Sequence, residues 1–344
     1  MIAYIVRRLL LLPIVLFGLL FVVFQMYNLL DPFQKLAVFV PDVSRLKSVD
    51  PHLLIKEYGL DKPWWYQFGR WLNNVVHGEF GWSKTANRDV LDAFKRFLPQ
   101  TVELTLWAAI PIILGGIWLG QLSAVKQNSA IDQFARVFAV TGWSLPTFVA
   151  GILRLFIFYG LLHWFPPGRL STNVGLYVFT SGEFHVYTGI ITLDAILNWN
   201  WWVFADALRH LVLPVLTLSY VSWALLLRVT RSSMLETLRQ EYIMTARAKG
   251  LSERLVIKRH ARRNALIPVA TIAGLTIAGL MGGVVITETI FDLPGIGRWA
   301  ANAARQFDMP ALLAYLLFSG FLIVIANLIV EVLYAVIDPR VRLE

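Results

Sequence analysis

The sequence predicts an all-α integral membrane protein with about six transmembrane helices. Of its 344 residues, 57% are hydrophobic and only 15% are charged, whereas a soluble globular chain is about 45–50% apolar and about 25% charged. The apolar residues gather in long runs, and the charged residues lie mostly between these runs. Composition and spacing therefore indicate the same fold class.

The apolar runs predict the transmembrane helices one by one. In order, they are residues 9–30, 101–123, 137–163, 208–228, 265–287 and 311–337. The first is longer than the apolar core of a signal peptide, about 7–15 residues, and no small-residue cleavage site follows it, so we expect it to remain as a helix. Gly115, Gly116 and Gly120 allow another helix to approach the second run closely, and Pro146 should kink the third.

The positive charges predict the orientation. The net charge is +9, but the excess lies beside apolar runs, where Lys and Arg mark cytoplasmic loops, so no nucleic-acid partner is expected. Arginines precede the first run at positions 7 and 8 and follow the last at Arg340 and Arg342. We therefore expect both termini in the cytoplasm.

Two polar segments are expected outside the cytoplasm, and they divide the chain. Residues 1–30 form the N-terminal transmembrane helix, 31–98 an extracytoplasmic segment, and 99–344 a core of five helices with a second extracytoplasmic loop at 164–206. Each polar segment carries tryptophans: Trp64, Trp65, Trp71 and Trp82 in the first, and Trp199, Trp201 and Trp202 in the second. Anchoring at the membrane interface is favoured over ligand stacking or a partner contact.

Arg154 interrupts the third run, where an apolar residue is expected. An arginine within a membrane is costly and usually turns toward protein or a water-filled path. Two interpretations of Arg154 therefore stay open: a position on a path through the membrane, or an ion pair with a carboxylate of a neighbouring subunit.

Residues 238–268 have the most distinctive pattern. From Arg231 to Arg263 the chain has nine Lys and Arg against three Glu, which indicates the cytoplasm. A short helix is expected over 241–249, with an acid at its start, bases at its end and Gly250 as a left-handed cap. At about 14 Å it is too short to cross a bilayer. Ile243, Ala246 and Gly250 form one small apolar side, which suggests docking on another protein; a solvated basic loop is the alternative.

The string TARAKGLSERLVIKRHARRNALIP resembles the cytoplasmic signature of ABC-transporter permease subunits of the dipeptide/oligopeptide type. The general permease consensus has Glu-Ala-Ala where this chain has Met244, Thr245 and Ala246, and a Pro where it has Arg263, with Pro268 following. These departures match the peptide type rather than the sugar-importer type. TGWSLPTFVAGILRLFIFYG, RHLVLP and ETIFDLPGIG also resemble this family, so the similarity covers nearly the whole chain.

The resemblance implies the B-type permease subunit of an ABC importer in the inner membrane of a bacterium or archaeon. The implied partners are a second homologous permease subunit, two ATP-binding subunits, an extracytoplasmic solute-binding protein and the lipid bilayer. Peptides are the expected substrate, with oligosaccharides or nickel chelates as alternatives. The residues implied in coupling to an ATP-binding subunit are Glu241, Ile243, Thr245, Ala246, Arg247, Ala248, Lys249, Gly250 and Leu251. The candidates for the pathway are Arg154, Glu288, Pro294 and Gly295.

Other functions have little support in the sequence. The chain has no GxxxxGK[ST], HExxH or GxSxG motif and no cysteine, so no catalytic or metal site is expected, and ATP and Mg²⁺ should bind in partner subunits. A secondary transporter would typically show an internal repeat, and a channel a selectivity filter. Neither is found, although both remain rivals from a different class of membrane protein.

Overall fold

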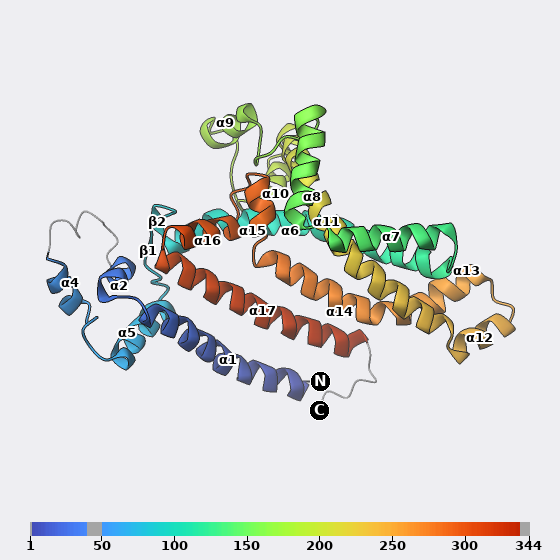
Figure 1. The fold of residues 1–344 in the computed structure, drawn as a ribbon, viewed down its shortest axis with the longest axis horizontal. Helices are drawn as coiled ribbons and strands as arrows, with labels where there is room; N and C mark the ends of the chain where they lie inside the picture. Colours follow the sequence, from blue (N-terminus) through green and yellow to red (C-terminus); the bar gives the residue numbers. More distant parts are fainter. Residues whose placement is uncertain (1, 40–49, 338–344) are drawn as a thin grey trace.

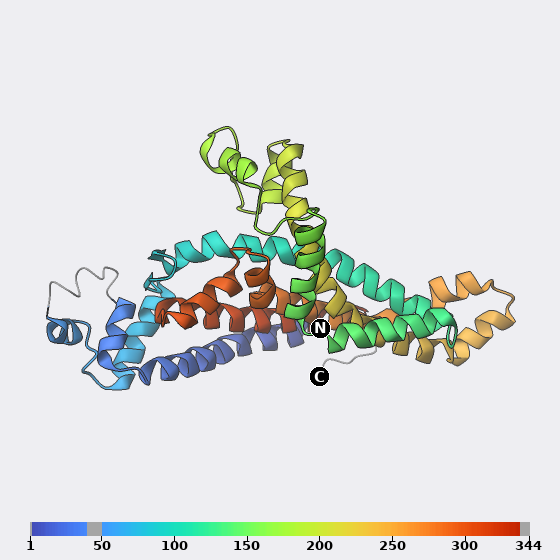
Figure 2. The same cartoon turned by 45° about the horizontal axis from the view of Figure 1, so that its top comes forward.

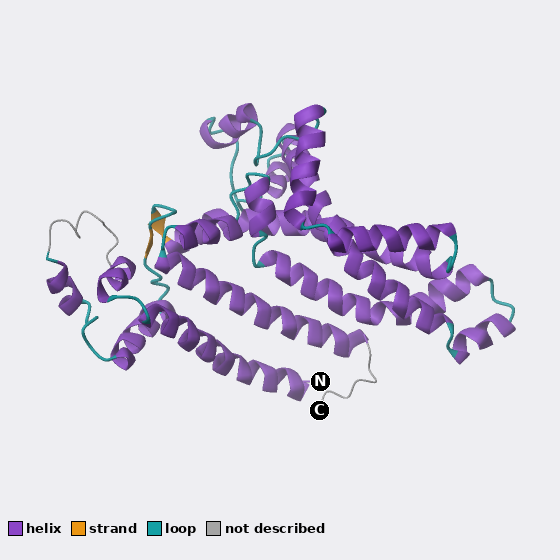
Figure 3. Cartoon of the chain, viewed as in Figure 1, coloured by secondary structure: helices purple, strands orange, loops and turns teal. Residues whose placement is uncertain are grey.

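A computed structural model describes residues 2–39 and 50–337; Arg340 and Arg342 lie outside this part of the chain. Nearly all of it is helical, and the two strands of the described residues, β1 (Trp82–Ser83) and β2 (Arg88–Asp89), form one short antiparallel hairpin (Figure 3). The predicted all-α class is confirmed. The high share of apolar residues in long runs explains it, because a helix satisfies every backbone hydrogen bond within one segment.

Four helices in the described residues are long and apolar enough to cross a membrane. They are α6 (Val90–Val125), α11 (Trp201–Leu238), the continuous run of α13 (Glu253–Leu255), η2 (Val256–Ala261) and α14 (Arg262–Met281), and α17 (Met309–Ile337). A fifth is present if the bent pair described next counts as one span, and α1 (Ile2–Asn28) adds a shorter apolar stretch at Pro13–Asn28. The count of six therefore stays a prediction.

The third predicted span is not one continuous helix. Its place is taken by α7 (Ala130–Ser144) and by α8 (Thr147–Arg154) with the π-helical η1 (Leu155–Leu161), and the two parts are bent by 103° (Figure 2). Pro146 removes one backbone donor and moves Leu145 out of the helical region, to φ −83° and ψ 118°. The kink expected at Pro146 is a break between two helices, and the span predicted over 137–163 stays a prediction for this bent pair.

The glycines of the second span lie at a close helix crossing, as expected. A side-chain carbon on Gly116 would come within 2.6 Å of Leu226 in α11, and the neighbouring glycines of α6 face other side chains of α11 in the same way. The indole nitrogen of Trp223 also donates a hydrogen bond to the carbonyl of Pro111, at 2.6 Å. The α6–α11 pair forms the main apolar core together with α14, because small residues let helix backbones approach closely.

The shorter elements lie at the two ends of these long helices and on one side (Figure 1). At one end are α2 (Pro32–Phe39), α4 (Pro51–Glu57), α5 (Trp64–Val76) and the hairpin, and at the opposite end are α12 (Glu241–Ala248) and α13. The side projection contains α9 (Thr172–Thr180) and α10 (Ile191–Leu197). Between α14 and α17 lie α15 (Val285–Ile290) and α16 (Ile296–Arg305).

Two findings revise expectations about the polar segments. Trp71 is buried against Phe24 and Phe68 rather than anchored at an interface, although Trp64 and Trp65 are exposed as expected. The 164–206 segment is tied to α6 by a buried ion pair between Glu103 and Arg169. Sequence inspection did not identify this pair, because its members are far apart along the chain.

Candidate functional site

The short helix predicted in the 238–268 stretch is present as α12, immediately after α11. Glu241 stands in its first turn and Arg247 in its last, where the helix dipole favours an acid and a base, respectively. Gly250 has a φ of +75°. Its N–H donates to the carbonyl of Arg247 at 2.9 Å, and the N–H of Leu251 reaches back to Ala246 at 3.4 Å. This is the Schellman arrangement that glycine favours, so the predicted cap is confirmed.

The small apolar side of α12 faces the protein's own core. Ile243 and Ala246 are buried in a cluster with Met234 of α11 and Ala124 of α6, and residues of η2 and α14 complete it. The expectation that this side receives another protein is therefore wrong for Ile243 and Ala246, whereas Gly250 is exposed. Burial of this side fixes α12 against three of the long helices.

The opposite side of α12 is exposed. At 100° per residue, the direction opposite to Ile243 and Ala246 is taken by Glu241, Met244, Thr245 and Ala248. All four are exposed. Among the residues predicted for coupling, Glu241, Thr245 and Ala248 thus point outward, Ile243, Ala246 and Leu251 contribute to the apolar cluster, and Lys249 and Gly250 form the exposed end of the helix.

Arg247 stiffens the turn that follows α12. Its guanidinium makes two hydrogen bonds with the carboxylate of Glu253, at 3.0 and 2.7 Å. Both side chains are about half exposed, at 42% and 55%, so the pair contributes little stability, about 0–1 kcal/mol. On the other flank, the amide of Asn264 donates to the hydroxyl of Tyr242 at 2.9 Å. These contacts hold α12 at a fixed angle to α14.

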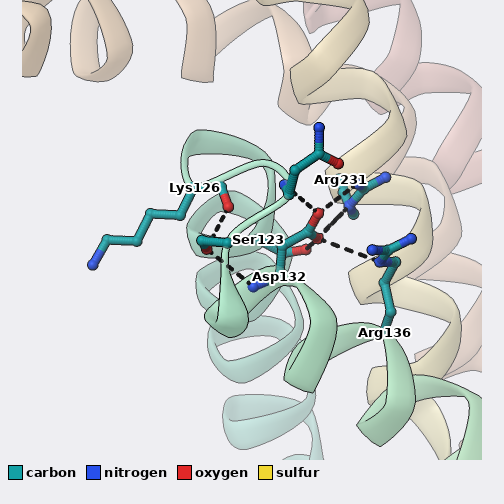
Figure 4. A network of polar contacts seen from close by, with 7 residues as sticks. Ser123, Lys126, Asp132, Arg136 and Arg231 are labelled. Atoms are coloured by element: carbon teal, nitrogen blue, oxygen red, sulfur yellow. Dashed lines mark hydrogen bonds and ion pairs between the residues drawn. The ribbon is translucent and has the colours of Figure 1, made fainter.

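A buried charge network supports α11 just before it leads into α12 (Figure 4). Asp132 of α7 is fully buried and accepts two hydrogen bonds from Arg231 of α11, at 2.8 and 2.9 Å. Its carboxylate also accepts from the hydroxyl of Ser123 at 2.5 Å and from the backbone N–H of Asn128 at 2.9 Å. Arg136 lies farther away, at 3.9 Å. The network fastens the α6–α7 loop to α11.

Sequence reasoning missed this network, although a signal was present. Asp132 is the one acid in the loop SAVKQNSAIDQFAR, which otherwise carries only basic and uncharged residues. A single acid among bases next to an apolar run indicates a candidate for an internal ion pair. Its partner, Arg231, lies 99 residues away, and in the sequence it is only the first base of the basic stretch that indicates the cytoplasm.

The second candidate region is the turn from α15 to α16, which encloses Glu288. The Glu288 carboxylate is 1% exposed and accepts hydrogen bonds of 2.7 Å from the hydroxyl of Thr101 and from the backbone N–H of Arg298. It therefore lies at the N-terminal end of α16, where the helix dipole favours an anion. Burial raises the pKa of Glu288, and these hydrogen bonds oppose that rise.

This geometry gives Glu288 and Gly295 a structural role in the turn. A side-chain carbon on Gly295 would overlap the Glu288 carboxyl group, and Pro294 directly precedes this close approach. The hydroxyl of Thr101 also accepts a hydrogen bond from the N–H of Ile296 at 2.9 Å. The carboxylate of Glu288 is thus enclosed by the loop itself rather than directed toward open space.

Arg154 lies at the end of α8 and is half-buried beside α11. Its guanidinium donates to the carbonyl of Ala150 at 3.0 Å and lies 5.0 Å from the ring centre of Tyr220. Within the described residues, no carboxylate pairs with it. The Tyr220 hydroxyl is in turn 2.9 Å from that of Thr141 in α7. The side chain of Arg154 therefore bridges the broken α7–α8 segment and α11.

Comparisons with known proteins show the family. The family described as "Binding-protein-dependent transport system inner membrane component" matches residues 112–343. The chain is 36% identical to the dipeptide transport system permease protein of Alkalihalophilus pseudofirmus, over 99% of this chain and 100% of that protein. It is 40% identical to the probable D,D-dipeptide transport system permease protein of Escherichia coli, over 83% and 82% of the two chains. It is 34% identical to the oligopeptide transport system permease protein of Bacillus subtilis, over 99% and 100%.

Proposed function

Because the chain belongs to the family of binding-protein-dependent transport system inner membrane components, of the dipeptide/oligopeptide permease type, we propose that it forms half of a translocation path for peptides and couples that path to ATP hydrolysis. In this proposal the other half comes from a second, homologous permease subunit. Two ATP-binding subunits dock on the cytoplasmic side, and a solute-binding protein delivers substrate from the opposite side.

The observation that carries the proposal is that α12 has one buried side and one exposed side. Its inner side is fixed in an apolar cluster with α6, α11 and α14, and its outer side presents Met244, Thr245 and Ala248. A force applied to the outer side is therefore transmitted to three long helices at once, because packed interiors are stiff. Coupling between two sites needs such a shared element, whose arrangement both ligands bias.

The same proposal orients the chain. If α12 faces the cytoplasm, the start of α1 and the end of α17 belong to the cytoplasmic half as well, since both lie at the helix ends that are farther from α2–α5 (Figure 1). The segment 31–98 and the loop 164–206 then belong to the extracytoplasmic side. Exposed Trp199, Trp201 and Trp202 in the second segment fit an interfacial belt.

We propose that Arg154 lies on the translocation path and that the α15–α16 turn lies at the mouth of this path. Arg154→Leu should lower uptake several-fold, because it removes the cation–π contact with Tyr220, worth about 0.5–2 kcal/mol, and a charge that substrate would meet. Arg154→Lys should keep more of the activity. The measurement is substrate uptake by the reconstituted complex, together with the yield of assembled complex. Unchanged values for both in Arg154→Leu would remove Arg154 from the path.

The substrate class needs its own assay. Peptides are the first choice, and oligosaccharides or nickel chelates are the alternatives in the same architecture. The purified solute-binding partner should bind di- and oligopeptides in a panel that also contains these two classes. A secondary transporter would instead take up substrate without ATP, driven by an ion gradient.

The coupling role is tested by adding volume on the outer side of α12. Ala248→Trp should leave the subunit inserted in the membrane and abolish substrate-stimulated ATP hydrolysis, because packed interfaces tolerate added volume poorly. Gly250→Trp is a poorer test, since at a φ of +75° any side chain strains the backbone. Gln127→Trp, in the exposed α6–α7 loop, is the matched control. Wild-type ATP hydrolysis and uptake in Ala248→Trp would refute coupling through this surface.

A further inference from the structure

A groove of about 900 Å³ lies between the C-terminal half of α6 and the start of the α13–η2–α14 helix. On one side it is lined by apolar residues of α6, among them Leu114, Trp118 and Leu122. On the other side it is lined by three cations, Arg254, Lys258 and Arg262. We call it the α6–η2 groove. No acidic residue lines it, so its lining combines an apolar wall with an unbalanced positive charge.

The three cations are displayed by the fold of their own segment. The opposite side of this segment is fixed in the core by Val256, Ala261 and Ala265, all fully buried. The cations follow one another at every fourth position, so they stay on the outer side. Within the described residues, none of the three has an ion-pair or hydrogen-bond partner for its side chain. A cluster of like charges without partners is unfavourable and is relieved by binding an anion.

The dimensions of the apolar wall match one leaflet of a bilayer. From Leu114 to Val125, the ends of the wall on α6, the helix rises about 16 Å, and half of the hydrocarbon core of a bilayer is about 15 Å. The wall continues beyond the groove as an exposed apolar stripe at every fourth residue, through Ile110 and Leu106.

From this lining we infer that the α6–η2 groove binds one anionic phospholipid of the leaflet on the α12 side. Its acyl chains lie along α6, and its phosphate lies between Arg254, Lys258 and Arg262. Basic pockets between transmembrane helices bind anionic headgroups in this way. The wall is too apolar for a free phosphate ion to be the better occupant. This site lies beside α12 but is separate from its outer side, so it does not depend on the proposed coupling role.

The test uses the complete transporter complex, purified in a neutral detergent and examined by native mass spectrometry. Phosphatidylglycerol, phosphatidylcholine or inorganic phosphate is added as the probe. The wild-type complex should retain phosphatidylglycerol in preference to phosphatidylcholine. Lys258→Gln/Arg262→Gln should weaken phosphatidylglycerol binding about 30-fold, the factor for two cations that each contribute about 1 kcal/mol.

The matched control is Arg259→Gln/Arg263→Gln, which removes the same charge from adjacent exposed positions that do not line the groove. This control should bind phosphatidylglycerol like the wild type. Equal effects of the two double variants would overturn the proposal and reduce these bases to a general positive surface. Displacement of the lipid by inorganic phosphate would assign the site to a free anion instead. Loss of an ATP-binding subunit or of the second permease from Lys258→Gln/Arg262→Gln, with lipid binding unchanged, would assign the groove to a protein contact.

Discussion

Position 295 needs a glycine because a side chain there would collide with the carboxylate of Glu288, and not because of its backbone conformation. Its φ is −87°, which any residue adopts. Yet a side-chain carbon there would overlap Glu288, which is held by Thr101 and by the N-terminal end of α16. The substitution therefore acts on a buried, hydrogen-bonded acid. Such a group is costly to displace, because its hydrogen bonds are lost without access to water.

We predict that Gly295→Ala destabilises the protein by about 2–3 kcal/mol through the displaced Glu288 carboxylate. The measurement is the midpoint of thermal unfolding in detergent. Gly279→Ala is the control, because nothing lies within 4 Å of a side-chain carbon at that helical position, and alanine favours a helix over glycine. An equal midpoint for Gly295→Ala and the wild type would show that the turn opens without cost.

The sequence predicts this turn but not its cause. Pro294, Gly295 and Gly297 mark a turn by composition alone. Gly295 is needed because the Glu288 carboxylate lies against it. A hydrogen bond from Thr101, which is 187 residues from Glu288 along the chain, holds the carboxylate there. Local patterns contain no information on such a long-range contact, so the sequence interpretation placed Glu288 at the mouth of a pathway and missed its enclosure.

At the scale of an element, α12 shows which features local patterns determine. Its start, its end and its glycine cap follow from charges and from one residue type, and all three are confirmed. The direction of its apolar side does not follow. Ile243 and Ala246 have the same spacing whether they face a partner or the protein's own core, and the structure places them in the core. The sequence likewise predicts a kink at Pro146 but not its angle of 103°, because the angle depends on the packing of α7 and α8.

The buried charge network of Asp132 and Arg231, which links α7 to α11, gives a prediction at this scale. Asp132→Asn should lower the free energy of unfolding by about 2–4 kcal/mol, because it leaves the charge of Arg231 without its buried partner. Arg231→Gln should have a similar effect, and the double variant should cost much less than the sum, which measures their interaction. The readout is again the thermal midpoint in detergent.

A matched control exists at the start of α6. Asp92 and Lys95 form an exposed pair at 3.0 Å, so Asp92→Asn should change the free energy of unfolding by at most about 1 kcal/mol. Additive effects of Asp132→Asn and Arg231→Gln on the free energy of unfolding would contradict this link between α7 and α11, since the effects of independent sites are additive. The two residues would then be neighbours without an energetic link.

At the scale of the whole molecule, composition and the apolar runs predict the fold class, whereas the assembly depends on other subunits. Apolar runs predict the long helices, because only a run of about 20 apolar residues crosses a bilayer. The resemblance in residues 238–268 agrees with the family match over residues 112–343. Large apolar side chains such as Trp118 and Phe134 remain exposed on α6 and α7. An apolar run has the same composition whether its side chains face lipid or another helix, so the runs predict the helices but not their neighbours.

The most direct test of the account asks what lies against the outer side of α12. The chain has no cysteine, so Ala248→Cys or Gln127→Cys introduces a single thiol into this subunit, in a complex whose other subunits have had their cysteines replaced. A short thiol-to-amine reagent should link position 248, but not position 127, to an ATP-binding subunit, with a yield that changes when ATP is bound. A link at position 127 and none at position 248, in a complex that hydrolyses ATP, would contradict coupling through α12.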